Sequence, residues 1–195
     1  MLNDTSSVIA AFLFKGQVAA ETVRPLTEVG RRSTDISYAE VGSKVALSLL
    51  DADLVSAAQK MSAVYVAIAS FENGVRDLVT SVLLEKKGAD WWNASVSNDV
   101  KKRAESRQKQ EEKIRWHQAR GLGPIYYVEL GDTVSIIQSN WPCFEDLLHD
   151  LDWVRQIFKS LERSRNVIMH SGQLSMDDIE RVGVFIRDWL RQIGA

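Results

Sequence analysis

The sequence predicts an all-α fold, and three observations support that class. Only three of the 195 residues are proline. Long stretches repeat apolar residues at alternating three- and four-residue spacings, which is the period of one face of a helix. The strict apolar–polar alternation of half-buried strands is scarce. A chain of this length also suits one domain of ordinary size with a real core.

The N-terminal part precedes that domain as a helical extension. Residues 8–23 have a helical pattern, which Arg24-Pro25 and Gly30 interrupt. Residues 43–50 then lead toward a long helix. Because no stretch rich in Gly, Ser or Pro marks a further boundary, we expect an extension over 1–40 and a single helical domain over 41–195.

The longest helix is predicted over residues 53–86. Its apolar residues recur at spacings of four, three, four, three and four, which keeps one stripe on one face. Two lysines and Gly88 then provide a basic end and a stop. The stripe consists of Val64, Ile68, Phe71, Val75, Leu78 and Val82.

A second helix, over residues 96–118, has a different character. The span 99–120 holds eight basic and four acidic residues, a net charge of +4. Such a helix is either solvated or packed against something charged, for example RNA. Arg103 and Arg107 are its candidate substrate contacts. The preceding Trp91 and Trp92 could stack on bases or pack in the core, and packing is the favoured interpretation.

Shorter elements follow, and two clear helices end the chain. Residues 121–124 read as a loop, 126–130 as a possible extended piece, 132–138 as a helix, and 143–149 as a short helix or turn. The last helices are predicted over 150–171 and 176–193. Ser175 and Asp178 form a capping box that starts the final one.

Composition and missing signatures exclude several classes of protein. The net charge is −2, which argues against a basic coat protein for nucleic acid. The single cysteine, Cys143, excludes a disulfide framework and a multi-cysteine zinc site. No P-loop, dinucleotide-binding, metalloprotease or serine-hydrolase signature is present. The apolar run 8–14 is too short to span a bilayer, so we expect a cytoplasmic protein with no membrane contact. Because the metal and cofactor signatures are missing, we also expect no metal and no cofactor.

The informative segment lies near the end of the helix over 150–171. Its stripe of Leu151, Val154, Phe158 and Leu161 continues onto Arg165. A guanidinium on an inner face needs a partner, which is either a carboxylate in the core or a phosphate in a cleft.

Two polar residues follow this arginine. Asn166 and His170 are four apart and share one face, whereas Arg165 and His170 are five apart and about 140° apart around the helix. They could frame one pocket, meet across a second protomer, or serve only as a structural arginine and a capping histidine.

The long helix offers a partner for Arg165. Glu72 and Arg76 are four residues apart beside its apolar stripe. They could form an ordinary helix ion pair or a functional one. Glu72 is also a candidate for the buried carboxylate that Arg165 requires.

The segment from Arg165-Asn166 to His170 resembles the signature of the HEPN superfamily. More of the chain, about residues 60–193, is similar to the Swt-type branch of that superfamily. The matching pieces are Ser70-Phe71-Glu72, Arg76-Asp77-Leu78, Asp90-Trp91-Trp92, Arg115-Trp116-His117, Pro124-Ile125-Tyr126-Tyr127, Gly131-Asp132, Ile136-Ile137, Trp141, Phe144, Arg165-Asn166, His170-Ser171 and Trp189-Leu190.

The resemblance implies a HEPN-like helical bundle, commonly a homodimer with the motif near the interface. It also implies a metal-independent endoribonuclease that leaves a 2′,3′-cyclic phosphate and a 5′-hydroxyl. His170 would be the acid/base group, Arg165 would stabilise the phosphorane, and Asn166 would orient the phosphate or the imidazole. Glu72, Arg76, Arg103 and Arg107 would support the site or bind substrate.

The resemblance leaves three functions open. Active members are often toxins or phage-defence effectors held in check by an antitoxin or NTPase partner. Other members are non-catalytic RNA-binding or dimerisation modules. A helical interaction protein with no nucleic-acid role is the third possibility. The intact motif favours the nuclease.

Overall fold

The computed structural model describes residues 37–114, 116–121 and 123–194. It divides into two compact units, Met1–Leu47 and Ser48–Ala195, which we treat separately. The described part of the first unit contains helix α2, Tyr38–Lys44, which begins with a capping box between Ser37 and Glu40. The helix predicted over 8–23 lies outside the described residues, and the boundary between residues 40 and 41 stays a prediction.

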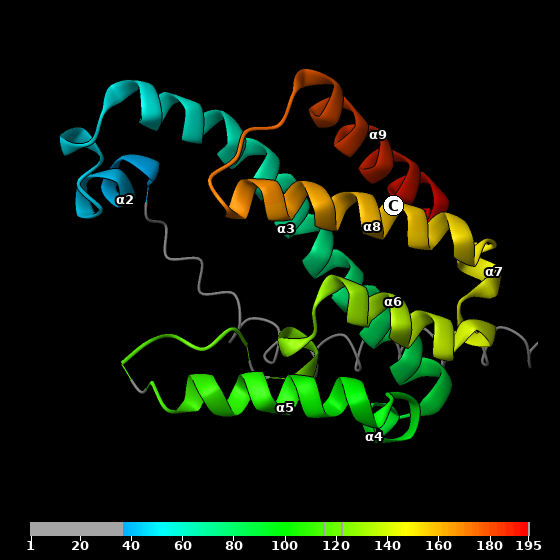
Figure 1. Ribbon diagram of the computed structural model, residues 1–195. Helices are drawn as coiled ribbons and strands as arrows, with labels where there is room; N and C mark the ends of the chain where they lie inside the picture. Colours follow the sequence, from blue (N-terminus) through cyan, green and yellow to red (C-terminus); the bar gives the residue numbers. More distant parts are fainter. Residues whose placement is uncertain (1–36, 115, 122, 195) are drawn as a thin grey trace, which may run out of the picture. The chain divides into compact units, whose positions relative to one another are not determined.

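All the regular secondary structure of the second unit's described residues is helical, which confirms the all-α prediction (Figure 1). A short 3₁₀ helix, η1, Leu47–Leu49, begins at its boundary. The other elements are α3 (Ala52–Lys87), α4 (Trp91–Ser95), α5 (Asn98–Glu112), η2 (Pro124–Tyr127), α6 (Leu130–Ser139), η3 (Trp141–Cys143), α7 (Glu145–Leu148), α8 (Leu151–Met169) and α9 (Met176–Gln192).

Helix α3 runs through this unit and contacts α4, α6, α8 and α9 (Figure 1). The Asp51 carboxylate caps its first turn, and Gly88 ends it at a φ of 81°, a conformation that glycine adopts at little cost. The predicted stripe is confirmed as far as Val75. Beyond it, Val79 and Leu83 are the buried residues, because a helix of 3.6 residues per turn drifts away from a strict seven-residue repeat.

Aromatic side chains join α3 to the two C-terminal helices. The Trp189 ring lies edge-on to Phe71 and Phe158, with centroids 5.6 and 5.3 Å away. Trp153 stacks on the other side of Trp189 at 6.0 Å. Offset and edge-on rings of this kind favour one packing geometry, so the cluster fixes how α8 and α9 lie against α3.

Helix α3 is the one helix among the described residues that is long and apolar enough to cross a membrane, by length and composition alone. Its inward residues belong to the core of the unit. Only 22% of its most apolar window is buried, however, and Leu54, Tyr65 and Val66 are exposed. The cytoplasmic location stays a prediction.

Two predicted elements differ from the structure. Helix α5 ends at Glu112 rather than residue 118, because its buried residues are Val100 and Ala104 and no apolar contact supports further turns. The possible extended piece over 126–130 is instead the 3₁₀ helix η2, with Pro124 in its first turn. Only Val128 and Glu129 keep an extended backbone there.

Candidate active site

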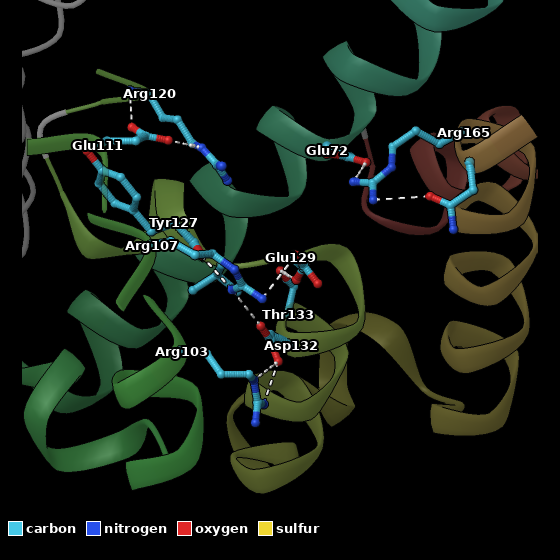
Figure 2. Close-up of polar contacts among 12 residues, drawn as sticks. Glu72, Arg103, Arg107, Glu111, Arg120, Tyr127, Glu129, Asp132, Thr133 and Arg165 are labelled. Atoms are coloured by element: carbon cyan, nitrogen blue, oxygen red, sulfur yellow. Dashed lines mark hydrogen bonds and ion pairs between the residues drawn. The ribbon is translucent and has the colours of Figure 1, made fainter. Parts of the chain in front are cut away.

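The site centres on the carboxylate of Glu72, which pairs with an arginine of its own helix and with Arg165 of α8. Figure 2 shows the contact between Glu72 and Arg165. Its Oε1 accepts from Nη1 of Arg165 at 3.1 Å, and its Oε2 accepts from Nη2 of Arg76 at 3.3 Å. The contact with Arg165 joins α8 to α3 over 93 residues of sequence. The predicted buried partner of Arg165 is thus confirmed as Glu72.

Two guanidiniums surround this one carboxylate, so the cluster retains a positive charge. The side chains of Glu72, Arg76 and Arg165 are only 10, 13 and 24% exposed. Arg76 also donates to the Val128 carbonyl and to Asn73. The Nε atoms of both arginines are buried without a hydrogen-bond partner. Hydrogen-bond donors without partners and a net positive charge, both largely shielded from solvent, favour the binding of an anion.

Asn166 and His170 lie on the outer side of α8. The Oδ1 atom of Asn166 accepts a long bond from Nη2 of Arg165 at 3.4 Å. His170 caps the C-terminus of α8 and donates its backbone N–H to the Asn166 carbonyl at 3.1 Å. Its imidazole is exposed and makes no hydrogen bond or ion pair with any described residue. The ring is therefore free to exchange a proton with a ligand.

Arg103 and Arg107 belong to a separate ion cluster (Figure 2). Nε and Nη2 of Arg103 donate to Oδ1 of Asp132 at 3.0 and 2.6 Å. Arg107 donates to Oδ2 of Asp132 at 3.2 Å and to the Tyr127 carbonyl at 2.9 Å, and pairs with Glu129 at 3.0 Å. The side chain of Arg107 is mostly buried, whereas that of Arg103 is 48% exposed.

This second cluster joins α5 to η2 and α6, so both arginines have a structural task. A substrate contact by either one stays a prediction. The sequence singled out neither Asp132 as a buried carboxylate nor Glu129 as a partner. One feature of the sequence did indicate such acidic partners. The helix predicted over 96–118 has an excess of basic residues and few apolar ones.

Asp132 makes the second cluster sensitive to acid. Burial acts to raise its pKa, but the hydrogen bonds from Arg103 and Arg107 outweigh it, so the pKa of Asp132 lies below its ordinary value. A carboxyl with a lowered folded pKa stabilises the fold above its unfolded pKa of about 4, and this contribution is lost as the pH falls through the folded value.

We expect Asp132→Asn to destabilise the domain by about 1.5–3 kcal/mol at pH 7, because it weakens charged hydrogen bonds and leaves arginines without their anion. The difference in free energy of unfolding between this variant and the unaltered protein should become smaller below about pH 4. Urea denaturation at neutral and acid pH measures both effects. Asp77→Asn is the control, since Asp77 is an exposed residue in the middle of α3. Equal losses of unfolding free energy in the Asp132 and Asp77 variants would contradict the role given to Asp132.

The tryptophan pair before α5 packs in the core, as favoured from the sequence. Trp91 is buried, Trp92 is partly buried against the core, and their rings meet edge-on with centroids 5.7 Å apart. Among the described residues, no three His, Cys, Asp or Glu side chains form a group that could hold a metal ion.

One comparison with known proteins, that with family models, gave a match that agrees with this architecture. The family model described as Swt1-like HEPN matches residues 67–194, a span that begins before Glu72 in α3 and includes Arg165, Asn166 and His170. Neither the curated proteins nor the solved structures gave a significant match. Since the family model covers most of the chain and the fold is a helical bundle, the chain belongs to the Swt1-like HEPN family.

Proposed function

We propose that this protein is a metal-independent endoribonuclease. The observation that carries the proposal is the combination of the mostly buried, positively charged cluster of Glu72, Arg76 and Arg165 with an exposed, unpartnered imidazole at the end of the same helix as Arg165. Transesterification of RNA needs a group that transfers protons and a group that stabilises the developing negative charge, and an imidazole and a guanidinium suit these two roles.

The reaction makes use of the RNA's own nucleophile. The 2′-hydroxyl loses its proton and its oxygen attacks the adjacent phosphorus. The bond from phosphorus to the 5′-oxygen breaks, and that oxygen gains a proton. A 2′,3′-cyclic phosphate and a 5′-hydroxyl result, with no net consumption of water.

Each site residue has a task in this scheme. The imidazole of His170 moves the proton, because an exposed imidazole can accept a proton and donate it again. The guanidinium of Arg165 offsets the charge that develops on the phosphorane, and Glu72 holds it in place. Asn166 lies between them on the surface of α8 and orients the phosphate or the imidazole.

The site is proposed to work as a homodimer. Tyr65 and Val66 are exposed apolar residues of α3, and Met169 and Met176 flank the loop that carries His170. That loop reaches α3, since the Leu174 N–H lies 3.3 Å from the Met61 sulfur, and Tyr65 is one turn further along. An apolar surface beside the motif favours a second copy whose motif completes the cleft.

The cellular role that we propose is that of a toxin or a phage-defence effector restrained by a partner protein. A second candidate is a non-catalytic RNA-binding or dimerisation module. It is favoured by one specific observation, namely that the Arg165 guanidinium already has a structural partner in Glu72. If Arg165 serves only to join α8 to α3, it has no need to contact an RNA substrate.

The test is incubation of the pure protein with RNA in EDTA, with analysis of the product ends. We expect cleavage that leaves 2′,3′-cyclic phosphate and 5′-hydroxyl ends. On size-exclusion chromatography the cleaving activity should elute with a species whose mass by light scattering is that of a dimer. RNA binding without cleavage would favour the non-catalytic module. Cleavage that disappears in EDTA and returns with a divalent cation would refute the metal-independent mechanism.

A further inference from the structure

A cavity of about 500 Å³ lies between α8 and α9, the two neighbouring C-terminal helices. It lies on a different side of α8 from the contact between Arg165 and Glu72, because residues 160, 163, 164 and 167 line it and residue 165 does not. The proposed chemistry does not use this cavity. Its walls are of two kinds, one apolar and one polar.

The apolar wall is suited to a flat ring. Val182 is buried, and Phe185 is half-buried with part of its ring available to the cavity. Val167 and Leu174 close the apolar surface from α8 and from the loop before α9. An aromatic side chain beside small aliphatic ones is a common surface for a nucleobase, since every base has a π-face.

The polar wall carries unused hydrogen-bond donors. The Arg163 guanidinium, the Ser164 hydroxyl and the Gln173 amide line the cavity, and none has a hydrogen-bond or ion-pair partner among the described residues. Arg181 pairs with Asp178 at 3.0 Å, and both of these residues line the cavity. Since they offset each other, the positive charge of Arg163 remains. The cavity therefore suits an anion joined to a planar group.

Arg163 connects the cavity to the proposed catalytic residues. It lies three residues before Asn166 and seven before His170, so all three share one face of α8. The distance from Arg163 to His170 along the helix axis is about 10 Å at 1.5 Å per residue. A chain whose phosphate lies at Asn166 and His170 can therefore place a neighbouring nucleotide at Arg163.

We propose that the cavity between α8 and α9 is a subsite for a nucleotide that flanks the scissile phosphate of the RNA. Arg163 binds the phosphate of that nucleotide, and Phe185 supports its base. Arg181 and Asp178, which pair with each other, add no net charge to this subsite. This inference rests on the proposed RNA substrate, and it assigns to the cavity a task in binding rather than in chemistry.

The test separates binding from cleavage by the use of a short, single-stranded 2′-O-methyl RNA, which lacks the nucleophilic hydroxyl. Fluorescence anisotropy gives its affinity for the full chain. We expect Arg163→Ala and Phe185→Leu each to weaken binding about fivefold or more. Arg163→Ala should also reduce the slope of log affinity against log salt concentration by about 0.7, the value for one lost contact with a single strand.

The matched control is Arg155→Ala. Arg155 is an exposed arginine of the same helix, paired with Asp152 and absent from the cavity wall. Melting temperatures verify that Phe185→Leu still folds, and the exposed Arg163 provides a variant that leaves the core intact. Unchanged binding in the Arg163 variant, or an equal loss in the Arg155 control, would overturn the subsite. Tighter binding of an acidic peptide than of RNA would also overturn it.

The two proposals fail in different ways. If the cavity variants bind 2′-O-methyl RNA more weakly while the unaltered protein cuts no RNA, the cavity stands as an RNA-binding site and the proposed nuclease activity is refuted. If the unaltered protein cuts RNA and the cavity variants bind and cut as it does, the nuclease stands and the subsite falls.

Discussion

Replacing His170 with alanine is expected to slow RNA cleavage by about 10²–10⁴-fold, the usual loss on removal of a general acid or base. The fold should be unaffected, because the imidazole is exposed and no described residue bonds to it. Quantification of cyclic-phosphate ends over time measures the rate, and circular dichroism measures the melting temperature. Free imidazole in the buffer should restore part of the activity.

His117→Ala is the control for this loss. His117 is also exposed, and its Nδ1 lies only 2.9 Å from the carbonyl of its neighbour Gln118. If both histidine variants cleave as the unaltered protein does, the assignment of His170 is wrong. If cleavage is lost together with the melting transition, the effect is structural.

Replacing Glu72 with alanine is expected to destabilise the domain by about 3–5 kcal/mol, the cost of removing one partner from a buried ion pair. Glu72 is buried on α3 and is the shared anion of Arg76 and Arg165. Without it, two guanidiniums face each other at low exposure. Urea denaturation measures the free energy of unfolding, and Glu85→Ala, an exposed change on the same helix, should cost less than about 0.5 kcal/mol.

A double-mutant cycle distinguishes this explanation from a simple loss of packing. Arg165→Met removes the charge on α8 but keeps a long side chain. When it is combined with Glu72→Ala, the total loss should be smaller than the sum of the single losses, because the charge of Arg165 is no longer left unpaired. Additive losses would show that Glu72 and Arg165 do not depend on each other.

The sequence predicted most of the helices for a clear physical reason. Burial of one face imposes a period near 3.6 on the apolar residues, and that period is visible in α3, α8 and α9 without knowledge of the neighbours. It also revealed Arg165 as a charge at an inner position, from which a buried partner followed. Glu72 satisfies that requirement across 93 residues of sequence.

The ends of elements without a strong apolar face were predicted less well. Helix α5 stops at Glu112, and the apolar residues Ile114 and Trp116 after it are exposed, so they bury no face that would support further turns. The 3₁₀ helix η2 replaces a possible strand because no neighbouring strand exists to pair with among the described residues. The ion pair of Arg103 with Asp132 was not predicted either, since the two residues are 29 positions apart in the sequence. Pairing between distant charges leaves no period in a sequence.

The sequence by itself determined the helical class, the family and the order of the motif residues, because helical periodicity and local spacing are properties of the chain. Only the tertiary structure decided that Glu72 holds both arginines, that Asp132 anchors the basic helix, and that a cavity with an unpaired Arg163 adjoins the motif. These features depend on which helices meet and at what angle, and side-chain packing in the whole core sets those angles.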